Sequence, residues 1–484
     1  MSKGGWFAKK NISDLVKEGA AESTKGLKRT LSAMNLTTFG VGAIIGAGIF
    51  VITGQAAAQY AGPAIMISFI IAGIIALFAA LCYAELSSMI PIAGSAYAYA
   101  YVALGEFAAW IIGWGLTLEY LFSVTTVAVG WSSYFVSFFK DIHVTIPFAY
   151  SSAPFIYDFK EGWQASGSFI NLPAMCVIAF IGVMVALGIK AAQRFNAIMV
   201  FVKMAIILLF VACGVAFINI ENWKPFIPEN TGVFGQYGWS GILKGSGLVF
   251  FAYLGFDAVS TLAQEAKNPQ KDLPLGTLGS LGISTIAYII VTMVLTGVVG
   301  YVHLNVADPI AVAVNTFGPH FIWLRFVVKV AILAGLTTVI LVMLLGQSRI
   351  FYAMAEDGLL PAFFKKIHPR FRTPFVSTLL ITAAAMLIAG FFPVSILGEL
   401  TVMGALIAFA MVCLGVLILR YKQPKIKRPF KVPLFPLIPI LGVVASLGQM
   451  VFFSGTTWVQ TVIWMVLGVA IYLFYGRKHS LVQK

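Results

Sequence analysis

The chain has 484 residues, of which 60% are hydrophobic and only 10% are charged. Its mean hydropathy is +0.93. A soluble core cannot enclose this much apolar surface, so the composition excludes a soluble globular protein and predicts an all-α integral membrane protein that crosses the bilayer several times.

The first residues are basic in character, reading MSKGGWFAKKNISDLVKEGAAESTKGLKRT at 1–30. They contain no short apolar run that ends in a small-residue cleavage site, which a signal peptide requires. We therefore predict that 1–34 is a tail on the cytoplasmic side of the membrane.

Apolar runs of about 20 residues, long enough to cross a bilayer, recur twelve times. An even number of crossings places both ends of the chain on one side, so 477–484 is expected on the same side as 1–34. The predicted transmembrane helices are 36–58, 63–88, 104–137, 172–189, 195–218, 241–264, 276–301, 322–353, 374–392, 396–419, 433–453 and 457–476.

The positive charges decide which side of the membrane each loop faces. With both ends inside, 25 of the 32 lysines and arginines fall in inner segments and only six in outer ones. Cytoplasmic loops carry such an excess, and the anionic inner leaflet favours it. The net charge of +14 thus predicts a multi-pass protein of the cytoplasmic membrane in contact with lipid, and it needs no nucleic-acid partner.

The first predicted span carries the run FGVGAIIGAGIF at 39–50, with glycines at 40, 42, 46 and 48. Glycine in a helix interior costs about 0.5–1 kcal/mol relative to alanine. Gly42 and Gly46 have the GxxxG spacing of close helix packing. The alternative is a helix that unwinds here and turns bare peptide groups toward a cavity. The spacing does not match a dinucleotide-binding loop.

Two later spans place a charged side chain at membrane depth. Glu119 lies midway in the third span and Lys203 lies within the fifth. A buried charge is costly unless it is paired, so each residue is a candidate for function by default. A structural glutamate bonded to a neighbouring helix remains an alternative for Glu119. The ammonium of Lys203 must pair, meet backbone carbonyls or lose its proton.

The sixth span is also interrupted, by Gly245, Gly247 and Gly255, and Asp257 follows directly. It lies five spans after the first. Two interrupted helices in corresponding positions indicate a transporter with inverted repeats. We therefore predict a first repeat at 35–218 and a second at 240–420, with the last two spans at 432–476 outside them.

The sequence contains little that indicates an enzyme. The five histidines all lie in predicted loops or tails, and there is no HExxH, P-loop or GxSxG sequence. The four cysteines lie in apolar spans without metal-ligand spacing. We expect no catalytic site, metal or cofactor.

Between the second and third spans, 91–101 is small and amphipathic, and we expect a short reentrant or interfacial segment there.

The chain resembles the amino acid-polyamine-organocation (APC) superfamily, specifically bacterial relatives of the cationic amino acid transporter (CAT) family. The likeness covers almost the whole chain after residue 28. It is carried by GVGAIIGAGIF at 40–50, YAELSSMIPIAGSAYAYAYVALGE at 83–106, GW at 113–114 with LEY at 118–120, FFAYLGFDAVSTLAQEAKNPQKDLP at 250–274 and GQSRIFYAMAEDGLLP at 346–361.

The resemblance implies a LeuT-like fold of 12 transmembrane helices, with a 5+5 inverted repeat and discontinuous helices 1 and 6. In such transporters, amides of the unwound first helix hold the substrate carboxylate, and carbonyls of helices 1 and 6 hold its amino group. The matching positions are Ala47 and Gly48, with Gly46 adjacent, for the carboxylate, and Ile44, Phe251, Ala252 and Leu254 for the amino group.

The resemblance also assigns roles to several side chains. Phe251 would gate the outer path, Met343 would limit the depth of the pocket, and Glu119 and Asp257 would line or flank it. Proton-coupled relatives place a lysine of helix 5 where sodium-coupled ones bind a cation, and Lys203 matches that lysine. Neighbouring oxygens would come from Gly42 with Thr337 or Thr338.

The implied function is proton-coupled symport of L-amino acids, with small neutral ones such as alanine favoured. Alternatives are transport or exchange of cationic amino acids, such as arginine and lysine, or of polyamines. A receptor that binds a nutrient without transporting it is a third class. A small accessory membrane subunit is a possible further partner that the sequence does not decide.

Overall fold

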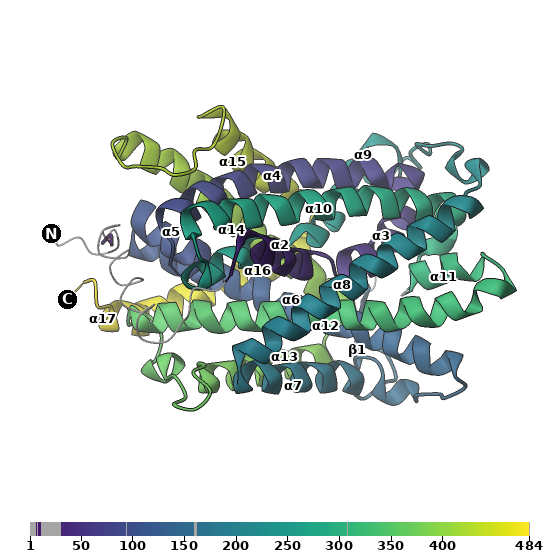
Figure 1. Cartoon of the computed structure of the whole chain (residues 1–484), viewed down its shortest axis with the longest axis horizontal. Helices are drawn as coiled ribbons and strands as arrows, with labels where there is room; N and C mark the ends of the chain where they lie inside the picture. Colours follow the sequence, from purple (N-terminus) through teal and green to yellow (C-terminus); the bar gives the residue numbers. More distant parts are fainter. Residues whose placement is uncertain are drawn as a thin grey trace.

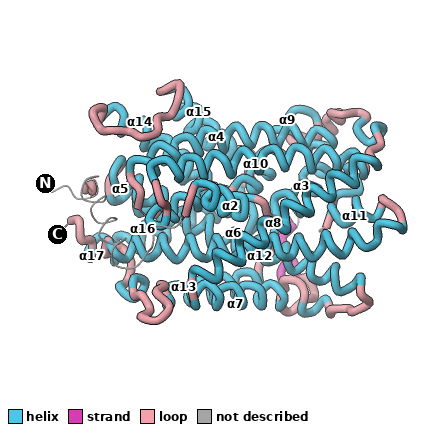
Figure 2. The backbone as a smooth tube through the Cα atoms, viewed as in Figure 1, coloured by secondary structure: helices cyan, strands magenta, loops and turns pink. Residues whose placement is uncertain are grey.

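The computed structural model describes residues 6, 8–10, 31–92, 94–158, 162–306 and 308–483. Most of the expected tail at 1–34, and Lys484, lie outside the described residues. Within the described part, the helices are joined by loops and accompanied by one small antiparallel sheet, in which Phe155 lies opposite Ala165. Figure 2 shows the helices running along the long axis, with loops gathered at the two ends.

The helices and strands follow one another along the chain as labelled in Figure 1. Their bounds are α2 (Ala33–Ile44), α3 (Thr53–Ala56), α4 (Ile65–Met89), α5 (Ser95–Ala103), α6 (Glu106–Asp141), β1 (Phe155–Asp158), β2 (Gly162–Ala165), α7 (Leu172–Leu187), α8 (Ile189–Gly214), α9 (Gly238–Val249), α10 (Pro269–Val298), α11 (Pro309–Asn315), α12 (Ile322–Glu356), α13 (Phe375–Phe391), α14 (Val394–Lys422), α15 (Leu437–Met450), α16 (Gly455–Ile471) and α17 (Arg477–His479).

Eight helical segments of the described chain are long and apolar enough to cross a membrane, which indicates a multi-pass membrane protein. The first of them, Ala33–Met89, contains two of the predicted spans. Three shorter apolar helices, α7, α13 and α15, coincide with three others. Each of the twelve predicted ranges overlaps helical residues, but the count of twelve crossings stays a prediction.

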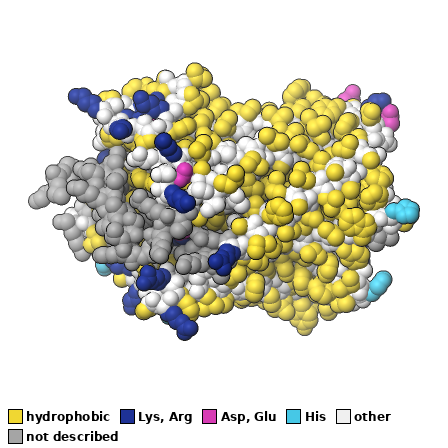
Figure 3. Space-filling model, viewed as in Figure 1, with side chains coloured by type: hydrophobic (Ala, Val, Ile, Leu, Met, Phe, Trp, Pro, Cys, Tyr) yellow, Lys and Arg dark blue, Asp and Glu magenta, His cyan; other side chains and the backbone are white. Residues whose placement is uncertain are grey.

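Apolar side chains cover the outside of the helix bundle as well as its inside. On α16 the exposed side chains include Val459, Val462, Ile463 and Val466. Figure 3 shows hydrophobic side chains over the middle of one face, with lysines and arginines gathered mainly at one end. Such an exterior suits hydrocarbon rather than water.

The helices α6 and α12 form the axis of the bundle. They are the longest helices described, with 36 and 35 residues, and they pack against each other. Each rises about 50 Å at 1.5 Å per residue, which exceeds the thickness of the hydrocarbon core. α6 also packs against α14, while α10 packs against α2 and α4.

The segment between the second and third predicted spans, which the sequence indicated as reentrant or interfacial, is enclosed by other helices. All nine residues of α5 are buried, and the helix packs on α6 and α14. Its alanines and tyrosines alternate, so small and large side chains fit between larger helices. The serine and tyrosine hydroxyls make this segment amphipathic in sequence, but in the structure the whole helix is buried against its neighbours.

Described residues from both ends of the chain meet at the start of α6. The backbone N–H of Glu106 donates to the carbonyl of Ala8 at 2.9 Å. The carboxylate of Glu106 accepts from the hydroxyl of Ser480 at 2.5 Å and from the amide of Gln483 at 2.7 Å. These two end segments therefore lie at the same end of the molecule.

Candidate functional site

The first interrupted helix breaks at Ile45. The helix α2 ends at Ile44, and Ile45 has an extended backbone with φ −74° and ψ 104°. The chain resumes at Ala47 and continues as a π-helical segment, Gly48–Ile52. The glycine run predicted to unwind thus contains the break.

The second interrupted helix breaks in the same manner. After α9, a 3₁₀ turn covers Phe250–Tyr253, and Leu254 is extended with ψ 143°. Gly255 follows with φ +108°, a conformation that favours glycine. The chain then continues as a 3₁₀ helix over Asp257–Glu265.

The two interrupted helices lie side by side and run in opposite directions. Just before α2, the N–H of Leu31 donates to the carbonyl of Glu265, at the end of the second interrupted helix, at 2.9 Å. Just before α9, the N–H of Tyr237 donates to the carbonyl of Tyr60, at the end of the first, at 2.7 Å. Each helix therefore starts beside the end of the other, which brings their middles together.

The backbones of the two breaks approach closely. A Cβ atom added to Gly48 would lie 2.3 Å from the Cα of Ala252. No side chain other than hydrogen fits there without displacing backbone. Gly48 is thus required by the contact between the two helices rather than by its own dihedral angles.

A tyrosine from a third helix bonds to both breaks. The hydroxyl of Tyr288 on α10 lies 2.8 Å from the carbonyl of Ile44 and 2.7 Å from that of Ala252. One hydroxyl proton serves only one of these acceptors at a time. Sequence reasoning missed Tyr288, and a single tyrosine in an apolar span was the only signal for it.

Lys203 on α8 is fully buried, and its ammonium reaches the first break. It donates to the carbonyl of Gly42 at 3.0 Å, to the carbonyl of Ile45 at 2.6 Å and to the hydroxyl of Thr338 at 2.8 Å. An ammonium has three protons, so all three of its donors are satisfied. The lysine links α8, α2 and α12 at one point.

The electrostatic setting of Lys203 contains dipoles but no counter-ion. Among the described residues no carboxylate lies within ion-pair distance of it. Carbonyls of the last turn of a helix lack intrahelical partners and carry partial negative charge. The ammonium satisfies two such oxygens where α2 is interrupted.

The structure distinguishes the two threonines proposed beside Lys203. The hydroxyl of Thr338 accepts from the lysine and lies 2.7 Å from the carbonyl of Gly335. The hydroxyl of Thr337 donates instead to Leu333, in the preceding turn of its own helix, at 2.6 Å. Thr338, and not Thr337, contributes to the lysine cluster.

Glu119 and Asp257 are both fully buried. Asp257 accepts at one oxygen from the hydroxyl of Tyr120, which is next to Glu119 in the chain, at 2.5 Å. Its other oxygen, and both oxygens of Glu119, have no hydrogen-bond partner among the described residues. These acceptors are open to a donor that is not part of the described protein.

The remaining predicted residues lie at the two breaks or against them. Phe251, Leu254, Ala47 and Met343 are buried. The N–H of Leu254 donates to the carbonyl of Phe251 at 3.3 Å. The terminal carbon of Met343 would lie 3.1 Å from a Cβ atom on Gly255, so the methionine packs directly on the break.

Outside this site, the described part of the chain contains a cavity but no metal cluster. Among the described residues no group of three His, Cys, Asp or Glu side chains could hold a metal. A cavity of about 340 Å³ lies between α14, α15 and α16, with Ile407, Met450 and Trp458 among its lining residues. None of the predicted substrate or coupling residues lines that cavity.

Comparisons with known proteins agree over nearly the whole chain. A sequence profile described as "Amino acid permease" matches residues 31–475. The chain is 45% identical over 478 residues to the methylthioribose transporter of Bacillus subtilis (strain 168), and 41% identical over 479 residues to the branched-chain amino acid permease BcaP of that organism; each match covers 99% of both chains. The vacuolar cationic amino acid transporter 4 of Arabidopsis thaliana is 38% identical over 399 residues, 82% of this chain and 64% of that one.

Proposed function

Because the chain belongs to the amino acid permease family of the APC superfamily, we propose that it is a secondary active transporter of L-amino acids driven by protons. The observation that carries the proposal is the meeting of two antiparallel interrupted helices at their breaks, beside a buried lysine. A continuous helix offers no free peptide groups at membrane depth, whereas an interrupted one does.

The zwitterionic part of the substrate binds to the backbone of the breaks. The carboxylate takes the amides at Ala47 and Gly48, with Gly46 adjacent. The ammonium takes carbonyls from Ile44 and from Phe251, Ala252 and Leu254. The hydroxyl of Tyr288 lies within hydrogen-bond distance of two of these carbonyls and donates to one at a time, so it competes for acceptors that the substrate ammonium needs.

Proton coupling acts through Lys203. The protonated lysine holds the end of α2 through Gly42 and Ile45, and it holds α12 through Thr338. When the proton leaves toward the inner side, these three bonds weaken together, and the first break loosens. Substrate release and proton release are thereby linked by one side chain.

The preferred substrates are neutral aliphatic L-amino acids, with small ones such as alanine favoured. The similarity to branched-chain permeases at 41% identity supports a neutral side chain. Phe251 and Met343 provide apolar contact on the outer path and at the inner limit of the pocket. The open acceptors of Glu119 and Asp257 bind water around such a substrate.

The same acceptors support a second candidate, transport of cationic amino acids or polyamines. Two buried carboxylates suit an ammonium or a guanidinium, and relatives named as cationic amino acid transporters are 33–38% identical. The similarity to a methylthioribose transporter makes a substrate with hydroxyl groups a further class to test. A Glu119→Gln variant separates these: it weakens uptake of arginine strongly if the substrate is a cation, and changes alanine uptake little.

The arrangement in the membrane is part of the proposal. We place 35–218 and 240–420 as inverted repeats, because α2 and α9 both have 12 residues, both precede a break and run in opposite directions. The two helices at 432–476 lie outside the repeats. The excess of basic residues supports a position in the cytoplasmic membrane with both 1–34 and 477–484 inside.

Purified protein in proteoliposomes tests the proposal. Each common amino acid, methylthioribose and a polyamine is offered as labelled substrate, with and without an inward acid gradient. We expect uptake of neutral L-amino acids that rises with the acid gradient and is competed by leucine. If no neutral amino acid is taken up or competes, the neutral preference is wrong.

Two other outcomes point to other classes of protein. Uptake only into vesicles preloaded with substrate, with no response to the acid gradient, indicates an exchanger. Binding without any movement of substrate indicates a receptor. Either result leaves the geometry of the breaks unchanged but removes proton-driven transport.

A further inference from the structure

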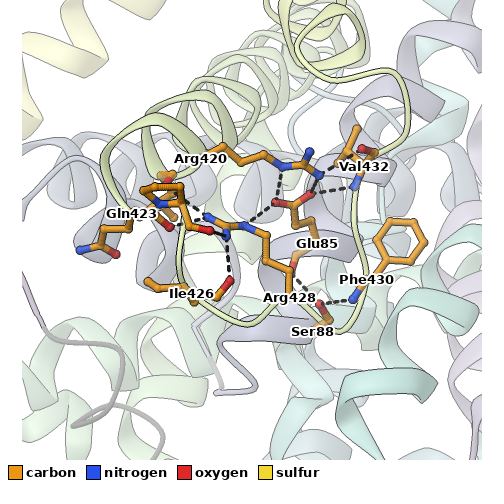
Figure 4. A network of polar contacts seen from close by, with 10 residues as sticks. Glu85, Ser88, Arg420, Gln423, Ile426, Arg428, Phe430 and Val432 are labelled. Atoms are coloured by element: carbon orange, nitrogen blue, oxygen red, sulfur yellow. Dashed lines mark hydrogen bonds and ion pairs between the residues drawn. The ribbon is translucent and has the colours of Figure 1, made fainter.

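The loop between α14 and α15 is fixed in shape by one buried carboxylate. Glu85 on α4 is 1% exposed. Its carboxylate accepts hydrogen bonds from the Nε of Arg420, at 2.9 Å, and from the Nη2 of the same arginine. It also accepts the backbone N–H of Val432 at 2.7 Å, and the Nε of Arg428 lies 3.3 Å away. Figure 4 shows Glu85 between the two guanidinium groups.

Arg428 also closes the end of α14. Its guanidinium donates to the carbonyl of Leu419 at 3.2 Å, to that of Gln423 at 3.0 Å and to that of Ile426 at 2.8 Å. The carbonyls of Leu419 and Gln423 also accept backbone N–H groups, at 2.9 and 3.4 Å, so the guanidinium is a second donor to each. Arg420, in the last turn of α14, and Arg428, in the loop, are therefore used internally, and the backbone between them is held in place.

The four lysines of the same segment point away from this network. Lys422, Lys425, Lys427 and Lys431 are all exposed, and none has an ion-pair partner among the described residues. No acidic residue occurs in 400–484. Burial lowers the pKa of Lys9, and repulsion from the positive charge of Lys422 lowers it further. The positive potential at Lys422 therefore reaches the segment that contains Lys9.

The lysines stand where the protein surface changes from apolar to basic. Tyr421 and Leu434, which flank the loop, are 69% and 71% exposed, and Leu437 begins the lipid-facing side of α15. Tyrosine is enriched at the interface between membrane and water. In Figure 3 lysines and arginines gather at this end of the molecule, beside the hydrophobic band.

From this geometry we propose that the α14–α15 loop is a binding site for the headgroups of anionic phospholipids. Lys422, Lys425, Lys427 and Lys431 meet the phosphates, while Tyr421 and Leu434 insert between the acyl chains. A cluster of at least four basic residues directly next to a transmembrane helix has the chemistry for this ligand. The network of Glu85 presents the lysines in a fixed arrangement, which distinguishes the loop from basic residues scattered elsewhere.

The test is native mass spectrometry of the purified full-length protein in detergent, titrated with phosphatidylglycerol and, separately, with phosphatidylcholine. The test variant carries Lys→Gln at 422, 425, 427 and 431. We expect the wild type to bind phosphatidylglycerol in preference to phosphatidylcholine. We expect the variant to lose about tenfold or more in affinity for phosphatidylglycerol, since each lysine contributes separately to attraction of the headgroup.

A matched control variant removes four exposed lysines elsewhere on the predicted inner side, Lys267, Lys271, Lys366 and Lys478. It is expected to keep the wild-type affinity for phosphatidylglycerol. Equal losses in both variants would mean that net charge alone attracts the lipid, and no loss in the test variant would exclude the loop; either result overturns the proposal. Inorganic phosphate that displaces the lipid at equal concentration would identify a free-anion site instead and would also overturn it.

Discussion

Two fully buried lysines in this protein sit in opposite electrostatic settings. Lys329 on α12 donates to Asp141 at 2.6 Å and to the hydroxyl of Ser137 at 2.7 Å, and it lies 3.5 Å from Asp308. Lys203 has neutral oxygens alone as acceptors. One ammonium is compensated by carboxylates, and the other is held by dipoles.

The difference determines what remains if either lysine loses its proton. Removal of the proton from Lys329 would leave buried carboxylates less compensated, which is strongly unfavourable. Removal from Lys203 leaves only neutral groups behind. Under the proposed coupling, the structural ammonium of Lys329 and the exchangeable one of Lys203 are distinguished by their partners and not by their burial, which is the same.

The largest expected effect comes from Lys203→Ala. The variant has no titratable group at the first break, so we predict that acid-gradient-driven uptake falls to the level of empty vesicles while the protein still folds. Uptake in proteoliposomes measures the first, and size-exclusion chromatography the second. Uptake that responds to the gradient as in the wild type would remove Lys203 from the coupling step.

The next effect comes from Lys329→Ala, and it should appear in stability. Removal of one partner from a buried ion pair costs about 3–5 kcal/mol where the other charge is left unpaired. Asp141 keeps Arg325 as an ion-pair partner, so we expect a loss below that range. We expect a clear drop in the thermal unfolding temperature in detergent. The exposed Lys140, at the end of α6, provides the control, because Lys140→Ala should change stability by less than about 0.5 kcal/mol.

Adjacent threonines on α12 sharpen the assignment of Lys203. Thr338→Val removes an acceptor from the ammonium, and we expect about a tenfold loss of acid-driven uptake, which corresponds to about 1.4 kcal/mol. Thr337→Val leaves the ammonium untouched and should transport at nearly the wild-type rate. Equal losses in the two variants would argue against a specific role for Thr338.

The smallest effect is expected from Tyr288→Phe. Loss of the hydroxyl removes the hydrogen-bond donor that the carbonyls of Ile44 and Ala252 share. Without added substrate, the variant should therefore lose about 1 kcal/mol of stability. If the substrate ammonium uses the same carbonyls, substrate will stabilise this variant more than the wild type. Thermal unfolding with and without alanine measures both. An equal gain from alanine in the two proteins would place the ammonium elsewhere.

The sequence predicted the interrupted helices and the buried Lys203, because both signals are local. Glycines in an apolar run and a charge at membrane depth are visible within one span. It did not predict the burial of Lys329, which lies near the start of the predicted helix 322–353. The acceptor Asp141 is 188 residues away, and nothing local indicates that it faces Lys329.

Tyr288 was missed for a similar reason, since its acceptor Ile44 is 244 residues away. The segment that forms α5 was predicted to be reentrant or interfacial, and its burial against α6 and α14 was not predicted. In each case the local sequence is compatible with lipid, interface or protein as the neighbour. Only the packing of distant helices selects among them.

By itself the sequence determined that the chain lies in a membrane, where its helices are, and where two of them break, since hydropathy, length and glycine content act residue by residue. Tertiary structure decided which groups meet. Thr337 and Thr338 are adjacent in the sequence but point about 100° apart around α12. The rotation of that helix against α8 turns one hydroxyl to Lys203 and leaves the other on its own backbone.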